Sequence, residues 1–194
     1  MANPQDEPVI VVSGLPRSGT SLMMQMLQAG GLQVLSDHER QADEDNPLGY
    51  HEFERVKALA KGDYLWLSAA RGRVVKVISA LLQQLPADES YRVIFMRRRM
   101  AEVLASQRKM LERRGEVGDA ISDERLSALF EKHLALVQDW LASQAHFAVL
   151  YIDYNAMLAA PDPALSGLEG FLGHSLNREA MRAIIDPSLY RNRA

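Results

Sequence analysis

Two hydrophobic patterns alternate along the chain. Short runs that are apolar at successive positions predict strands buried on both faces of a parallel sheet. Segments with apolar residues three and four positions apart predict helices. The strand runs are 9–12, 74–78, 92–96 and 147–152, with a further short strand expected at 32–35. The helical segments are 20–29, 52–61, 100–114 and 123–144. This alternation predicts an α/β fold, a P-loop-type domain of three layers with a mainly parallel central sheet flanked by helices.

Composition narrows the class of protein. The 194 residues are 47% hydrophobic, enough for the core of a single domain over 1–194, with flexible ends expected at 1–7 and 191–194. The formal net charge of -3 argues against a general nucleic-acid binder, so an anion site must be local. The chain has no cysteine, which excludes thiolate chemistry. Without a signal-peptide pattern or an apolar run of bilayer length, we expect a cytoplasmic protein with no integral membrane association.

A glycine-containing loop, residues 14–21, joins the first predicted strand to the first predicted helix and reads GLPRSGTS. Gly14 and Gly19 have the spacing of a phosphate-binding P-loop, but Thr20 stands where that pattern has lysine. Backbone N–H groups and the following helix N-terminus still favour an anion. Arg17 offers a cation inside the loop that could face the bridging oxygen or sulfuryl group of a donor without a metal. The alternative is a tight turn with Arg17 exposed.

A second basic site is predicted where the strand 92–96 ends in three arginines. Ligands of α/β sheets bind at such strand ends. Arg98 lies at the strand exit, and Ser106 follows eight positions later, about two turns into the next helix. An arginine and a hydroxyl in this relation can grip one phosphate.

Together these motifs resemble the PAPS-dependent sulfotransferase superfamily, in particular its small bacterial members. The loop 14–21 is similar to the family's 5′-phosphosulfate loop, and Arg98 with Ser106 is similar to its 3′-phosphate motif. Segments 151–154 and 186–193 also resemble bacterial members. The resemblance implies PAPS (3′-phosphoadenosine 5′-phosphosulfate) as co-substrate and PAP as product, with no metal. The implied donor site consists of Gly14, Pro16, Arg17, Ser18, Gly19, Thr20, Ser21, Arg98 and Ser106.

For catalysis, the expected residues are Arg17, beside the leaving phosphate, and Glu52, as the base. Glu52 ends a segment, 46–52, that resembles the acceptor side of bacterial sulfotransferases; the alternatives are that it caps the following helix, or that His51 or His38 is the base. The histidine that some relatives carry after the third strand is absent from the stretch 76–79.

The roles of several cations stay open at this stage. Lys76 either assists the sulfuryl group or is structural, and Arg191 or Arg193 either reaches the 3′-phosphate or belongs to a frayed tail. Arg99 is followed by Met100, where many relatives have an acidic residue or asparagine and then proline.

The sequence therefore predicts a sulfotransferase that moves a sulfuryl group from PAPS to a hydroxyl or amine of a small-molecule or carrier-borne acceptor. A P-loop kinase or hydrolase is the competing enzyme, although the missing lysine counts against it. A nucleotide-binding protein without catalytic activity is the non-enzyme alternative. Fold does not determine the acceptor.

Overall fold

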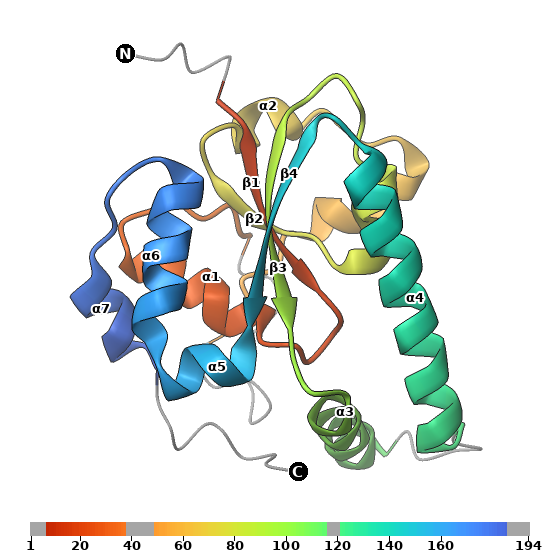
Figure 1. Cartoon of the computed structure of the whole chain (residues 1–194). Coiled ribbons are helices and arrows are strands. Elements are labelled where there is room, and N and C mark those ends of the chain that lie inside the picture. Colours follow the sequence, from red (N-terminus) through yellow and green to blue (C-terminus); the bar gives the residue numbers. More distant parts are fainter. Residues whose placement is uncertain (1–6, 38–48, 116–120, 186–194) are drawn as a thin grey trace.

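A parallel sheet of four strands forms the centre of the computed structural model, which describes residues 7–37, 49–115 and 121–185 (Figure 1). The strand order is β2-β1-β3-β4, and each neighbouring pair runs parallel. The strands are β1 (Val9–Gly14), β2 (Val74–Lys76), β3 (Tyr91–Arg97) and β4 (Phe147–Asp153). The predicted α/β class and the parallel sheet are confirmed.

β1 lies inside the sheet and is buried along its whole length. Because side chains alternate across a strand, Val9 and Val11 enter one core cluster while Ile10 and Val12 enter the other. The continuous apolar run in the sequence is thus explained by cover on both faces.

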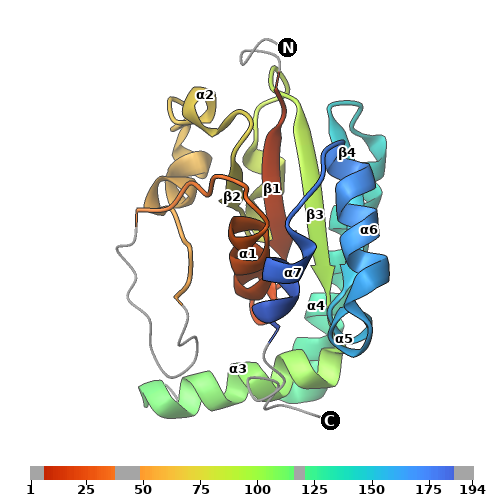
Figure 2. The same cartoon turned by 90° about the vertical axis from the view of Figure 1, so that its left-hand side faces the viewer.

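Helices cover each face of the sheet (Figure 1). On one side lie α1 (Thr20–Ala29), α5 (Tyr154–Ala159), α6 (Pro161–Leu172) and α7 (Arg178–Ala183). On the other lie the short elements η1 (Glu54–Lys61), α2 (Leu67–Ala70) and η2 (Ser79–Gln84), with the long helix α4 (Asp123–Ser143). The helix α3 (Met100–Arg114) lies across the end of the sheet where the strands terminate (Figure 2).

Two predicted elements differ in type from the structure, and the strand expected over 74–78 ends at Lys76. The segment 32–35 forms a single parallel bridge, from Val34 to Val74, rather than a strand. The helix expected over 52–61 is a 3-10 helix that begins at Glu54, because Phe53 is extended and the carboxylate of Asp37 accepts the Glu54 N–H at 2.6 Å. The short elements α2, η2, α5 and α7 and the helix α6 were not predicted individually.

Some predictions concern residues outside the described ranges. These include His38, Arg191, Arg193 and most of the predicted flexible ends. Within the described ranges, every helix is too short or too polar to cross a lipid bilayer.

Candidate anion-binding site

The loop between β1 and α1 is closed by a tight turn. Ser18 donates two hydrogen bonds to the Leu15 carbonyl, from its N–H at 3.2 Å and from its hydroxyl at 2.7 Å. A Cβ atom on Gly14 would lie 2.5 Å from Ser18 Oγ and 2.7 Å from the Met96 carbonyl oxygen, so position 14 requires glycine. The loop then leads into the first turn of α1, where N–H groups lack intrahelical acceptors and favour an anion.

Arg17 is held at both its side chain and its backbone by the second motif. Its backbone is left-handed, with φ of 69°, which costs a non-glycine residue of order 1–3 kcal/mol. Its Nε donates to Ser106 Oγ at 2.8 Å, and its carbonyl accepts from Arg98 Nη1 at 3.1 Å. The structure therefore brings the glycine loop and the pair Arg98 and Ser106 into one site.

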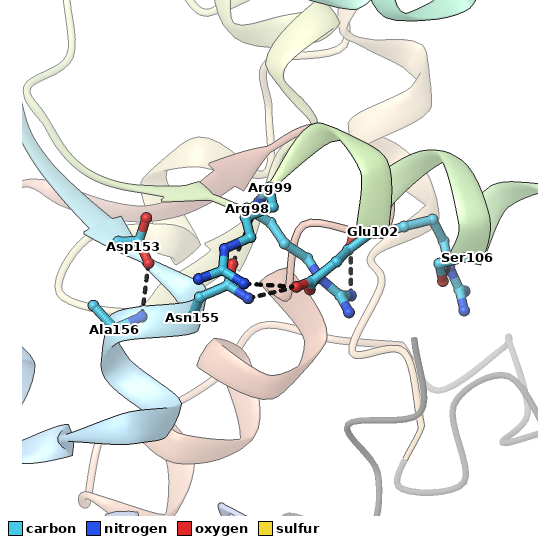
Figure 3. Close-up of polar contacts among 8 residues, drawn as sticks. Arg98, Arg99, Glu102, Ser106, Asp153, Asn155 and Ala156 are labelled. Atoms are coloured by element: carbon cyan, nitrogen blue, oxygen red, sulfur yellow. Dashed lines mark hydrogen bonds and ion pairs between the residues drawn. The ribbon is translucent and has the colours of Figure 1, made fainter. Parts of the chain in front are cut away.

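Arg98 is fixed from several sides. Its Nε donates to Glu102 Oε2 at 2.9 Å, and its guanidinium carbon lies 4.5 Å from the centre of the Tyr154 ring. The side chain of Arg98 is 8% exposed and that of Glu102 is fully buried. Asn155 Nδ2 donates to the second Glu102 oxygen at 2.8 Å (Figure 3). A guanidinium in this setting has little freedom to reorient.

Lys76 lies at the end of β2 and extends to the same loop. Its ammonium donates to Ser21 Oγ at 2.9 Å and to the Tyr50 carbonyl, and the residue is 7% exposed. A buried ammonium needs such hydrogen bonds because burial removes its water. Lys76 thus connects the start of α1 to the segment that carries Glu52.

Glu52 lies in a segment that is fastened to its surroundings by backbone contacts. Its carbonyl accepts from Ser36 Oγ at 3.0 Å and from the Asp37 N–H at 3.3 Å. Three residues earlier, the Gly49 carbonyl accepts from Gln25 Nε2 at 3.3 Å. The carboxylate that caps η1 is that of Asp37, and η1 begins two residues after Glu52.

The family model of the sulfotransferase domain matches residues 7–193. The chain belongs to the sulfotransferase family. No curated protein gave a match.

Solved structures share the fold of the chain at low sequence identity. A sulfotransferase domain from the curacin biosynthetic pathway is 17% identical with a TM-score of 0.54, over 90% of this chain and 76% of that one. Retinol dehydratase in complex with androsterone and PAP is 16% identical, with a TM-score of 0.52 over 95% and 64% of the two chains. Mouse sulfotransferase SULT7A1 in complex with PAP is 17% identical, with a TM-score of 0.51 over 100% and 68%.

Sequence reasoning missed part of this candidate site. Glu102 was detectable in principle, because it lies in the first turn of α3 only four positions after Arg98, within reach of a local sequence pattern. Tyr154 and Asn155 had no such signal, since they follow β4 and reach Arg98 and Glu102 only through the order of the strands. Pro16, which was expected at the donor, is exposed.

The arrangement concentrates positive charge at the end of the sheet. Arg17, Arg98 and Lys76 come from three separate parts of the chain and meet at one loop, where the buried carboxylate of Glu102 accepts from Arg98. Partly buried cations with fixed hydrogen bonds can stabilise an anion without moving, which suits the binding of a phosphate and the transfer of an anionic group.

Proposed function

We propose that this sulfotransferase takes the sulfuryl group from PAPS and transfers it to a hydroxyl or amine of a small-molecule or carrier-borne acceptor. The observation that carries the proposal is the hydrogen bonding of Arg17 to Ser106 and of Arg98 to the Arg17 carbonyl. Two cations and a hydroxyl from distant parts of the sequence thereby face one region. Two solved structures with this fold contain PAP, which supports the choice of donor.

In the proposed complex, the loop holds the 5′ end of the donor. Backbone N–H groups of residues 17–21, with the hydroxyls of Thr20 and Ser21, bind the 5′-phosphate, while Gly14, Pro16, Ser18 and Gly19 shape the loop. Arg98 and Ser106 bind the 3′-phosphate. Arg17 belongs to the loop that is proposed to hold the 5′-phosphate, and its side chain contacts Ser106, which is proposed to bind the 3′-phosphate. The Arg17 guanidinium therefore lies between the two proposed phosphate sites.

The reaction that follows is a substitution at sulfur. The acceptor oxygen or nitrogen forms a bond to sulfur while the bond from sulfur to the bridging oxygen of the 5′-phosphate breaks. That oxygen leaves with the bonding electrons as part of PAP, and the acceptor proton passes to the Glu52 carboxylate. Arg17 and Lys76 balance the charge that grows on the leaving phosphate. This proposed reaction uses no metal ion, so a chelator is expected to leave the transfer rate unchanged.

Nucleotide binding tests the donor site. Purified protein is titrated with PAP, AMP and ATP with Mg²⁺, and the titrations are repeated with Arg98→Ala and Ser106→Ala. AMP is PAP without the 3′-phosphate, so we expect PAP to bind more tightly and both variants to lose that preference. Arg97→Ala is the matched control, because Arg97 contacts Gln138 and the Tyr151 ring instead.

The same titration distinguishes the competing functions. Binding of ATP with Mg²⁺ that equals PAP binding and ignores both substitutions would overturn the proposed donor and favour a kinase or hydrolase. Retained PAP preference without sulfuryl transfer to any hydroxyl or amine acceptor would instead favour a binding protein. Arg17→Ala is expected to lower transfer by roughly two to three powers of ten, as removal of a preorganised charge partner commonly does.

A further inference from the structure

Glu102 lies at the centre of a buried polar network in the first turn of α3. Its carboxylate accepts from two elements at once, from Arg98 Nε at 2.9 Å and from Asn155 Nδ2 at 2.8 Å (Figure 3). Asn155 is held in turn, since its Oδ1 accepts the Arg99 N–H at 3.3 Å. The network therefore links the end of β3 and the start of α3 to the first turn of α5.

A fully buried carboxylate is costly unless its oxygens are hydrogen-bonded, so this position demands a physical explanation. Contact with Arg98 Nε fixes the rotation of the guanidinium about its long axis. The same rotation directs Nη1 to the Arg17 carbonyl at 3.1 Å and lays the guanidinium over the Tyr154 ring. Glu102 thus sets the direction of Arg98, while Asn155 sets the direction of Glu102.

We propose that Glu102 and Asn155 are positioning residues that orient Arg98 and thereby determine the preference of the site for a nucleotide with a 3′-phosphate. The inference rests on the proposed function, because it assigns the 3′-phosphate to Arg98. A donor with a free 3′-hydroxyl gains nothing from an oriented Arg98. The network therefore acts on the distinction between PAP and AMP rather than on nucleotide binding in general.

A purely electrostatic role of Glu102 would change the preference for PAP in the opposite direction. The Glu102 carboxylate repels a nearby phosphate, so removal of its charge would tighten binding of PAP more than of AMP. If Glu102 orients Arg98, replacing Glu102 lowers the preference for PAP. Two variants separate these explanations: Glu102→Asp keeps the charge but is one methylene too short to meet both partners, and Glu102→Gln keeps the length but turns one acceptor into a donor.

The experiment measures dissociation constants of PAP and AMP by calorimetry for the full chain and its variants. The PAP-over-AMP ratio is the Kd of AMP divided by the Kd of PAP, so it falls when the preference for PAP is lost. For Glu102→Asp we expect the PAP-over-AMP ratio to fall about 10- to 100-fold with AMP binding unchanged, the range of a lost charge-assisted contact. Asn155→Ala, which leaves Arg98 and Glu102 in place, is expected to lower the ratio about 2- to 10-fold. Glu112→Gln, an exposed position nearly three turns further along α3, is the charge control.

A double-mutant cycle completes the test. In an Arg98→Ala background, Glu102→Asp is expected to leave the PAP-over-AMP ratio unchanged, because no guanidinium remains to orient. Thermal unfolding of each variant monitors the fold, and a lower melting temperature with an unchanged ratio would reduce the network to a structural role and overturn the inference. A ratio that rises in Glu102→Gln and stays constant in Glu102→Asp would assign the effect to charge. Wild-type protein without PAP preference would refute the donor assignment and this inference together.

Discussion

Gly19 is the position at which the structure makes its sharpest stability prediction. It stands at the N-terminus of α1 with φ of 99°, a conformation that residues with a Cβ rarely adopt. A Cβ atom there would lie 2.3 Å from Tyr154 Cδ2 and 2.8 Å from Cε2. Gly19→Ala therefore adds backbone strain and also displaces the ring that lies beneath the Arg98 guanidinium.

The cost can be separated into two contributions. The positive φ costs about 1–2 kcal/mol, and forcing an atom into a packed site costs about 1–3 kcal/mol. Gly31→Ala is a matched control, because Gly31 has φ of 104° and nothing lies within 4 Å of its added Cβ. Gly31→Ala should therefore be destabilised only by the cost of the positive φ. For a domain of this size, the second contribution lowers the melting temperature by a further ~2–12 °C.

Thermal unfolding by circular dichroism and a PAP titration measure the two consequences. We expect Gly19→Ala to unfold at a lower temperature than Gly31→Ala and to bind PAP more weakly. In a Gly19→Ala background, Tyr154→Leu should cost less than it does alone, since the smaller side chain relieves the contact. Equal melting temperatures for the two alanine variants would refute the claim that the Tyr154 ring packs against the loop.

Three further predictions concern catalysis and the pH dependence of stability. Glu52→Gln should lower the steady-state transfer rate about 100-fold or more with little change in PAP affinity, and an unchanged rate would move the role of base to His51. Lys76→Met, which keeps the apolar stem, should lower the same rate about tenfold or more, and a rate equal to wild type would make Lys76 structural. Hydrogen bonding from Arg178 lowers the pKa of Glu169, so the pair stabilises the fold above the unfolded-state pKa and the gain is lost as pH falls through the folded-state pKa. The melting-temperature difference between wild type and Glu169→Gln should thus be present at pH 7 and shrink below about pH 4, and a difference that persists in acid would contradict this origin.

The sequence predicted those features whose evidence lies within a single short segment. β1 is apolar at every position because both its faces are covered, and that run predicted a parallel strand without knowledge of its neighbours. The spacing of Gly14 and Gly19 predicted the loop, since each glycine meets a local steric demand. The interval from Arg98 to Ser106 predicted the second motif, because a strand end and two helical turns have fixed dimensions.

Local patterns failed where a contact depends on a distant partner. The segment 32–35 has the composition of a strand but forms one bridge, because whether it pairs depends on β2. The 3-10 helix η1 begins where Asp37 accepts the Glu54 N–H, a contact across 17 positions that no helical periodicity reports.

Tertiary structure alone decided how the site is assembled. The sheet order places the end of β3 beside the ends of both β1 and β4, so that Asn155 meets Glu102 across 53 positions and Arg17 meets Ser106 across 89. Composition and spacing thus determined which chemistry the chain carries, because residue types and local backbone geometry are written in short segments. The orientation of that chemistry was decided by packing, because the direction of a buried guanidinium is set by hydrogen-bond partners that only the fold brings within reach.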